Sequence, residues 1–384
     1  MPAPRSVRIL IPLLLLLLSP RAAKAQRWVA VDVGSSHTCA LDSRGRAFCW
    51  GINHYGELGA HTPETCAPAH HGGERSCYAS PSREPVAVAG GTRFRSISAG
   101  SNVSCGLDGR GRAWCWGQDV GTARGGCARG EVCAFAPQPF APEMAFRFLR
   151  VAEDAVCGIT RQGAGHCWRP VHGRPGRAMT EVAPGERLAW VDHYGDWMAR
   201  DEHLICAATV DGRALCQGMN DLAQLGAGDT VPRTGAVRVA SAARFTRVHP
   251  WGWSACGLTA EGAAECWGAA EPRPSWPGGA PSNPAFFACG TSAWCSGPRA
   301  AAPGLRFAAL TFVDDRFCGL AAGEVHCWGI EGVPVRAAEG LRFTALEGGE
   351  THACGLTRDG AIWCWGQDVD EDLTQPVRVP DPPR

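Results

Sequence analysis

Lysine is nearly absent from this chain. Lys24 is the single lysine, although Lys and Arg together number 37 against 37 Asp and Glu. Loss of residues 1–25 would remove four cationic side chains and no acidic one, leaving about four more negative than positive charges. Nucleic-acid binding depends on basic patches. A mildly acidic chain without lysine therefore predicts no nucleic-acid partner.

Long apolar runs are missing beyond the N-terminus. The run from Ile9 to Leu18 has about ten residues, whereas a membrane-spanning helix needs about twenty. It follows a basic start and precedes the small-residue pattern Ala23-Lys24-Ala25, which is typical of a secretory signal cleaved after Ala25. We therefore expect residues 1–25 to be a signal peptide. The mature protein is predicted to have no membrane span and to be secreted, either extracellular or periplasmic.

The short motifs of common catalytic and metal sites are also missing. There is no G-x-S-x-G elbow, no H-E-x-x-H pair, no phosphate-binding loop and no C-x2-C. The stretch from Gly252 to Cys256 contains a serine but misses the second glycine of the elbow. We therefore expect a non-catalytic protein without cofactor or metal site. A secreted hydrolase or lyase on the same scaffold is the alternative.

Two possible metal sites have weaker support in the sequence than the solvated loops that we expect in their place. His61, His70 and His71 could bind a metal ion, but adjacent histidines in a polar loop are usually solvated. The acidic residues at 368, 370 and 372 alternate as calcium ligands do, yet no bidentate Glu or turn glycine follows at the expected place. We expect solvated loops in both places. The histidines beside repeated cysteines are expected to serve strand packing or hydrogen bonding: His37, His326 and His352.

Cysteine, in contrast, is abundant and regularly spaced. Seven times a cysteine is followed nine or ten residues later by a second one, with a glycine turn between them. A unit repeated about every fifty residues indicates an array. Zinc ligands usually lie two to four residues apart, so disulfides formed in an oxidising compartment are the better interpretation. The predicted pairs are Cys39 with Cys49, Cys105 with Cys115, Cys157 with Cys167, Cys206 with Cys216, Cys256 with Cys266, Cys318 with Cys327, and Cys354 with Cys364.

The first unit shows how these cysteines can pair. Residues 43–45, Ser-Arg-Gly, can form a three-residue hairpin loop closed by a glycine in the left-handed region. Cys39 then faces Cys49 on a non-hydrogen-bonded rung, where Cα atoms lie about 4.5 Å apart, within reach of a disulfide. In the sixth unit the interval is one residue shorter. There Ala322-Gly323 can form a two-residue turn that keeps Cys318 opposite Cys327.

The six remaining cysteines also form local pairs, each in an insertion after a hairpin. Together with the hairpin pairs they would give ten bridges and leave no thiol over, although connectivity cannot be deduced from sequence. The predicted insertion pairs are Cys66 with Cys77, Cys127 with Cys133, and Cys289 with Cys295.

Each unit supplies four short strands. Alternating apolar residues precede the first cysteine, two strands flank the hairpin, and a Pro-Val strand often follows the next loop. Four-stranded units repeated around an axis are propeller blades, and a closed ring leaves few exposed sheet edges. We therefore predict an all-β fold: residues 26–384 form a closed seven-bladed β-propeller with one disulfide per blade hairpin. Its units begin near residues 27, 93, 147, 187, 244, 306 and 342. The last strand, 376–379, is predicted to pair with 28–33 at the closure.

The run from Cys49 to Gly59, CWGINHYGELG, resembles the repeat of the regulator of chromosome condensation family. The run from Cys216 to Gly226 is a second similar stretch, whereas unit three has Arg169 where a glycine is expected. The resemblance covers nearly the whole mature chain and implies a seven-bladed propeller. The founding member is an intracellular nucleotide exchange factor that binds chromatin, while secreted bacterial relatives include β-lactamase inhibitors, which bind a protein through loops on one face. The export signal, the disulfides and the lack of a basic face separate this chain from the founding member, so an exchange-factor-like role follows by analogy only.

The leading hypothesis is a secreted or cell-surface protein, monomeric, that binds another protein or a surface glycan through its loops. The contact regions are the insertions at about 60–84, 118–142 and 269–304, which follow the same point of the repeat. The alternative is that these insertions are tolerated surface decoration. Aromatic side chains are the candidate anchors: Tyr55, Tyr78, Phe135, Trp276 and Trp294.

Overall fold

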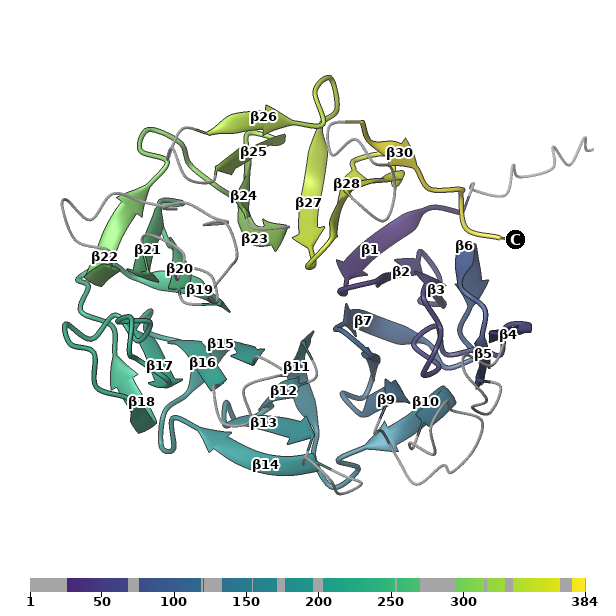
Figure 1. Cartoon of the computed structure of the whole chain (residues 1–384), viewed down its shortest axis with the longest axis horizontal. Helices are drawn as coiled ribbons and strands as arrows, with labels where there is room; N and C mark the ends of the chain where they lie inside the picture. The colour runs from purple at the N-terminus through teal and green to yellow at the C-terminus, as the bar shows by residue number, and fades with distance from the viewer. Residues whose placement is uncertain are drawn as a thin grey trace, which may run out of the picture.

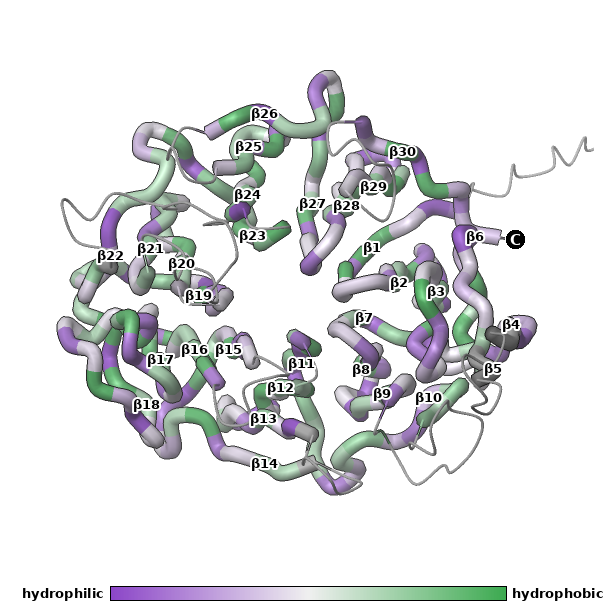
Figure 2. Tube along the Cα trace, viewed as in Figure 1, coloured by the Kyte–Doolittle hydropathy of each residue, from purple (hydrophilic) through white to green (hydrophobic). Residues whose placement is uncertain are grey.

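Seven four-stranded antiparallel sheets surround a central axis, so the predicted seven-bladed propeller is confirmed (Figure 1). This computed structural model describes residues 26–67, 76–118, 120, 133–153, 155–170, 177–195, 203–252, 254–269, 294–313, 316–328, 334–366 and 375–383. The expected signal peptide, 1–25, lies outside these residues. Hydrophobic stretches occur in every blade (Figure 2), and the blades pack against one another through buried side chains.

In each blade the first strand lies nearest the axis and the fourth lies at the rim (Figure 1). Blades one to three comprise β1 (Trp28–Val33), β2 (His37–Asp42), β3 (Ala47–Gly51) and β6 (Ser82–Ala87); β7 (Phe94–Ala99), β8 (Val103–Asp108), β9 (Ala113–Gln118) and β10 (Cys133–Phe140); and β11 (Phe146–Ala152), β12 (Ala155–Thr160), β13 (Gly165–Pro170) and β14 (Arg177–Val182). A separate two-stranded sheet, β4 (Glu64–Ala67) with β5 (Ser76–Ala79), lies in the first insertion.

The remaining blades have the same order. Blades four to seven comprise β15 (Leu188–Gly195), β16 (His203–Thr209), β17 (Ala214–Gly218) and β18 (Arg233–Arg238); β19 (Phe245–Trp251), β20 (Ser254–Thr259), β21 (Ala264–Ala269) and β22 (Trp294–Ala301); β23 (Ala309–Val313), β24 (Arg316–Ala321), β25 (Glu324–Trp328) and β26 (Val335–Ala337); and β27 (Phe343–Gly348), β28 (His352–Thr357), β29 (Ile362–Gly366) and β30 (Val377–Arg378).

The hairpin disulfides form as the spacing predicts, one across the second and third strands of each blade. Their Cα–Cα distances are 4.0–4.2 Å, so the paired cysteines face one another directly. All seven predicted hairpin pairs are bridged: Cys39 with Cys49, Cys105 with Cys115, Cys157 with Cys167, Cys206 with Cys216, Cys256 with Cys266, Cys318 with Cys327, and Cys354 with Cys364.

The sixth blade shows how a shorter loop keeps the same pairing. Ala322 and Gly323 have φ of 50° and 84°, which are the left-handed values that a two-residue hairpin turn requires. The backbone of Cys318 therefore stays opposite that of Cys327, although only nine residues separate them. The predicted turn is confirmed.

Six inner strands begin with a large buried side chain that covers the middle of its own blade, and in blade six Phe307, just before β23, has the same position. A Cβ on Gly106 would lie only 2.5 Å from the Phe94 ring, and a Cβ on Gly355 only 2.3 Å from the Phe343 ring. Glycine after the first hairpin cysteine therefore makes room for an aromatic ring. The Cys-Gly-Leu pattern in the sequence is thus a packing signal.

The connections between strands divide between two ends of the propeller, because neighbouring strands are antiparallel. We call the end with the second-to-third hairpins and the blade-to-blade connections the turn face; its segments are all short, as in 43–46 and 88–93. The strand ends that the first-to-second and third-to-fourth connections join lie at the other end, the mouth face. The variation in length is found there, since the third-to-fourth connections are 52–81, 119–132, 171–176, 219–232, 270–293, 329–334 and 367–376.

The predicted strand exchange at the ring closure is wrong. The last strand, β30, pairs with β29 and completes its own blade, while β1 pairs with β2. The reason is the strand order: every unit begins at the axis and ends at the rim, so the last strand is already the fourth of its blade. The ring closes by side-chain packing instead. Val379 is buried in a cluster with Trp28, whose indole N–H donates to the Pro380 carbonyl at 3.1 Å.

Truncation of Val379 should weaken this closure. We expect Val379→Ala to lower the free energy of unfolding by about 2 kcal/mol, because a buried valine loses its packing against the first blade. The matched control is Val377→Ala in the same segment, since Val377 is 46% exposed and Val379 only 7%. Urea denaturation of the two variants measures the difference. Equal losses would contradict closure through Val379.

Candidate functional site

One position of the inner strand is polar in all seven blades. It is the residue that pairs with the first hairpin cysteine, and paired residues project from the same face of a sheet. These side chains therefore occupy equivalent places around the axis. We call them the polar ring: Asp32, Ser98, Arg150, Asp192, His249, Thr311 and Glu347.

Arg150 joins carboxylates from three other blades. Its guanidinium lies 3.4 Å from Asp192, 3.6 Å from Glu347 and 3.8 Å from Asp32, and its side chain is only 15% exposed. Burial disfavours the charge on Arg150, but the three carboxylates outweigh it and raise its pKa above the ordinary value. The guanidinium also lies over the Trp190 ring at 5.8 Å. Arg150 is therefore a charged cross-link between blades one, three, four and seven.

Asp192 orients the next member of the ring. Its Oδ2 lies 2.9 Å from His249 Nδ1, and both side chains are buried. Burial disfavours the carboxylate, but Arg150 and His249 outweigh it and lower the pKa of Asp192. Burial also lowers the pKa of His249, so the imidazole of His249 is neutral near pH 7. An ionised carboxylate can only accept, so Nδ1 carries the proton and Nε2 presents its lone pair.

For the other two carboxylates of the polar ring, the charge of Arg150 does not offset the effect of burial on the pKa. Burial raises the pKa of Asp32 despite the nearby guanidinium. Burial, with the charge of Asp32 added to it, raises the pKa of Glu347 to about 7. The charged groups that act on Glu347 are Asp32 on β1, Arg150 on β11 and Arg247 on β19. Three carboxylates share one close guanidinium, so full ionisation of all three would leave surplus negative charge, and Glu347 keeps its proton up to about pH 7.

The raised pKa of Glu347 predicts a pH-dependent stability. The folded state holds this proton up to about pH 7, whereas an unfolded glutamate loses it near its ordinary value of 4.5. Stability from this group is therefore present at low pH and lost as the pH rises from about 4.5 to 7. We expect wild type to lose about 1–3 kcal/mol more than Glu347→Gln between pH 5 and 8. Urea denaturation at both pH values measures this, with exposed Glu84→Gln as control; parallel pH profiles for wild type and Glu347→Gln would contradict it.

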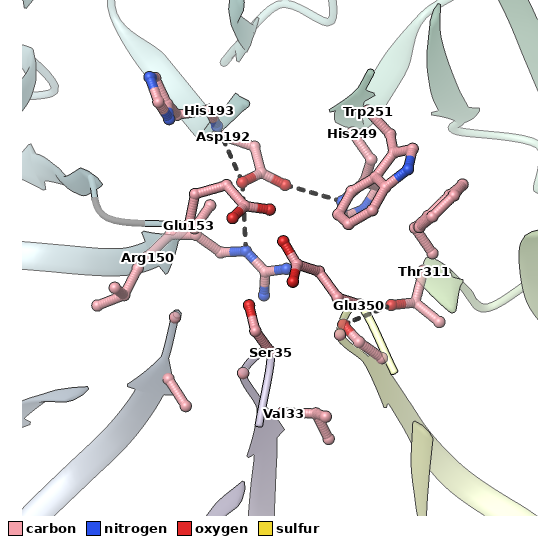
Figure 3. Close-up of a pocket in the computed structure, with 18 of the residues that line it drawn as sticks. Val33, Ser35, Arg150, Glu153, Asp192, His193, His249, Trp251, Thr311 and Glu350 are labelled. Carbon is pink, nitrogen blue, oxygen red and sulfur yellow. Dashed lines mark hydrogen bonds and ion pairs between the residues drawn. The ribbon is translucent and has the colours of Figure 1, made fainter. Parts of the chain in front are cut away.

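A pocket of ≈ 60 Å³ opens where the first and second strands of the blades are joined, so it lies on the mouth face. Figure 3 shows Glu153 and Glu350 pointing into it near the Arg150 guanidinium, with Trp251 on another side. Glu153 accepts a hydrogen bond from Ser101 at 2.8 Å. Its φ of 49° lies in the left-handed region, which costs a non-glycine residue about 1–3 kcal/mol and is concentrated at functional sites.

The five aromatic residues that the sequence predicts as anchors are not among those that line this pocket. Tyr55 is half-buried in the loop after β3, and its backbone N–H donates to Glu57 at 2.8 Å. Phe135 is half-buried and stacks on His61 at 4.7 Å, so it joins the first two insertions rather than standing free. Tyr78 belongs to β5 and Trp294 to β22, but the structure describes only their backbone. Trp276 lies outside the described residues.

The boundaries of two insertions also need correction. Residues 133–140 and 294–301 are not loops, because they form β10 and β22, the rim strands of their blades. Cys133 and Cys295 are disulfide-bonded, while Cys127 and Cys289, the partners predicted for them, lie outside the described residues. The backbone of Cys66 pairs with that of Cys77 across β4 and β5, in agreement with the third predicted pair.

Two of the three histidines beside the cysteines, His37 and His352, have the hydrogen-bonding role expected for them. His37 Nε2 lies 2.7 Å from Ser104 Oγ of the next blade, and His352 Nε2 lies 2.6 Å from Thr38 Oγ1. In the parts of the chain that the structure describes, no three His, Cys, Asp or Glu side chains are grouped to hold a metal ion. The acidic residues at 368, 370 and 372, with His70 and His71, fall outside those parts.

The sequence did contain a signal for the polar ring. In six units the ring residue stands seven positions before the first hairpin cysteine, as Arg150 does before Cys157. In the fourth unit the interval is longer, because residues 196–202 intervene between Asp192 and Cys206. A polar residue at a fixed place within an otherwise apolar strand is recognisable once the units are aligned.

Comparison with known families and structures agrees with this architecture. Residues 28–57, 94–120 and 343–370 match the model of the regulator of chromosome condensation (RCC1) repeat. The repeat loop has the same geometry in blades one and four, since Asn53 Oδ1 accepts from Leu58 N–H at 3.0 Å and Asn220 Oδ1 from Leu225 N–H at 2.9 Å. A comparison with curated protein sequences finds no match.

Several solved structures share the fold. Human WBSCR16 has 15% sequence identity and a TM-score of 0.66, over 88% of this chain and 95% of that one. Prp20p from Saccharomyces cerevisiae has 17% identity and a TM-score of 0.60, over 84% of this chain and 80% of that one. The ectodomain of the Arabidopsis thaliana receptor kinase ACR4 has 17% identity and a TM-score of 0.52, over 93% and 99%. The chain therefore carries regulator of chromosome condensation (RCC1) repeats in blades one, two and seven and is similar in fold to Prp20p.

Proposed function

We propose that this protein is an extracellular, non-catalytic binding protein that contacts a partner protein through the mouth face. The observation that carries this proposal is the position of the strand ends that the variable connections join: these ends share one face with the pocket, while the opposite face has only short turns. Variable loops on a rigid scaffold are where binding residues concentrate. A surface glycan is the other partner class that the same face would serve.

The setting of the protein supports the same proposal. Seven hairpin disulfides are typical of an oxidising compartment, in agreement with a signal at residues 1–25. No helix among the described residues is long and apolar enough to cross a membrane. Of the similar structures, that of ACR4 is an ectodomain, and Prp20p is described with binding properties to Gsp1p and histones. At 17% identity, these relatives support protein binding in general and no particular partner.

Trimming the insertions tests the proposal. The gaps at 68–75 and 270–293 lie between directly paired residues, Ala67 with Ser76 and Ala269 with Trp294, so an Asn-Gly turn can close each one. A short Gly-Asn-Gly linker can replace 121–132 while Val120, which is buried, is kept. Cys133 and Cys295 are changed to serine in the trimmed protein, so that no thiol is left over.

Both proteins are then used to capture partners from secreted and surface fractions. We expect the intact protein to enrich a partner that the trimmed protein fails to retain. Equal capture by two folded proteins with the same melting temperature would overturn binding through the insertions. A partner that is released by glycosidase treatment would identify a glycan.

The Asp192–His249 pair favours a hydrolase or lyase as the second candidate. A neutral histidine oriented by a buried carboxylate is the arrangement of a general base. The candidate predicts turnover of ester, glycoside or polyuronate substrates that His249→Asn abolishes. Turnover that survives this substitution would contradict a catalytic role of the pair.

A further inference from the structure

The mouth pocket is lined by several hydrogen-bond acceptors. Glu153, Asp192 and Glu350 line it, and the ring carboxylates Asp32 and Glu347 lie beside Arg150, which also reaches its wall. Five carboxylates therefore gather around one close guanidinium. Clefts lined by one sign of charge concentrate ligands of the opposite sign.

His249 adds an independent observation that points to a ligand. It is only 6% exposed, lines the pocket and makes its hydrogen bond through Nδ1 to Asp192. Nε2 is buried but has no hydrogen-bond partner among the described residues. A buried polar atom without a partner is rare and costly. Because Nε2 holds a lone pair, the missing partner must be a donor.

An aromatic wall completes the pocket. Trp251 follows His249 by two residues on β19, lines the pocket and is partly exposed, and its indole stacks on Phe312 at 3.8 Å. Stacking holds the indole in place. A cation over a tryptophan face gains about 0.5–2 kcal/mol, depending on how far it is desolvated.

We propose that the mouth pocket binds a guanidinium or ammonium group, carried by an arginine or lysine side chain of the partner protein. This inference rests on the proposed binding function of the mouth face. The side-chain tip would donate to Glu153 and Glu350 at the entrance and to His249 Nε2 deeper in. The three ring carboxylates contact Arg150, and Glu153 and Glu350 add further negative charge at the entrance. A pocket of ≈ 60 Å³ takes such a tip and excludes a bulky ligand.

Calorimetric titration with blocked amino acids tests this proposal. The probe is N-acetyl-arginine amide, and the matched control is N-acetyl-citrulline amide, which has nearly the same shape without the charge. We expect arginine to bind at least about tenfold more tightly at pH 8 and low salt, and the advantage to shrink as salt is added. Equal binding of the two compounds, or no heat from either one, would overturn the proposal.

Protein variants locate the binding. Glu350→Gln, alone and combined with Glu153→Gln, should weaken arginine binding, the double variant by about tenfold or more. The control combines Glu84→Gln with Glu339→Gln, which removes two exposed carboxylates from a rim strand and the turn face. Glu350 is exposed, so its single variant keeps the test valid if the double variant is unstable. Unchanged affinity in Glu350→Gln and in a folded double variant would contradict binding in this pocket.

Two further titrations distinguish a cation on a peptide side chain from a free small molecule. Acetyl-Gly-Arg-Gly amide should bind at least as tightly as agmatine, a free guanidinium compound. Binding of agmatine with exclusion of the tripeptide would overturn the assignment to a protein side chain.

If the arginine probes fail while insertion-dependent capture persists, this inference is wrong and the proposed function stands. If capture is independent of the insertions, the proposed function fails whatever the small probes show.

Discussion

Replacement of Arg150 by methionine is expected to lower the free energy of unfolding by about 3–5 kcal/mol at pH 8. The substitution keeps the length and apolar volume of the side chain but leaves Asp32, Asp192 and Glu347 facing one another without their shared cation. Breaking a buried ion pair costs more than the pair contributes, because uncompensated charge stays in a poorly solvated place. Urea denaturation gives the loss directly.

The pH dependence of that loss identifies its cause. At pH 5 part of the penalty should disappear, because Glu347 and Asp32 take up protons more readily once the guanidinium is gone. Arg83→Met is the control, since Arg83 is exposed on the rim strand β6. A loss below about 1 kcal/mol, or a loss that does not change between pH 8 and pH 5, would contradict the role of Arg150 as a charged cross-link.

Removal of one hairpin disulfide has the second largest expected effect. The double variant that combines Cys105→Ala with Cys115→Ala should lose about 3 kcal/mol, since in the entropic model a bridge across ten residues restricts the unfolded chain by about that amount. Both cysteines are fully buried, so lost packing adds to the effect. Chemical denaturation under oxidising conditions measures it.

A reductant provides the control for this experiment. Under reducing conditions wild type loses the same bridge, so the difference between the two proteins should shrink to the packing of two thiols. A difference that is unaffected by the reductant would mean that packing alone, and not the covalent link, produces the loss.

The blade architecture was predictable because its information is local. The interval between Cys39 and Cys49, with Gly45 between them, fixes turn length, register and disulfide together. The sixth unit shows this most clearly, because Ala322-Gly323 shortens the loop and the cysteines still meet. Local patterns of this kind repeat in every unit and reinforce one another.

The site was not predictable in the same way, because it is made between blades. Arg150 contacts Asp32 and Glu347, which stand near opposite ends of the sequence and meet only when the ring closes. The error about the last strand has the same origin: the sequence shows a strand without a following unit, but only the order within a blade shows that β30 is its rim strand. Phe135 was singled out for its aromatic character, whereas its neighbour His61 determines its role.

Photo-crosslinking from the two faces tests the central claim most directly. Val231, in a mouth-face connection of blade four, is 55% exposed, and Val210, in a turn-face connection of the same blade, is 53% exposed. A photoreactive phenylalanine at each position is offered to the same secreted and surface fractions. The account predicts a covalent adduct from position 231 and none from position 210. Equal adducts from both positions, or an adduct from position 210 alone, would contradict binding through the mouth face.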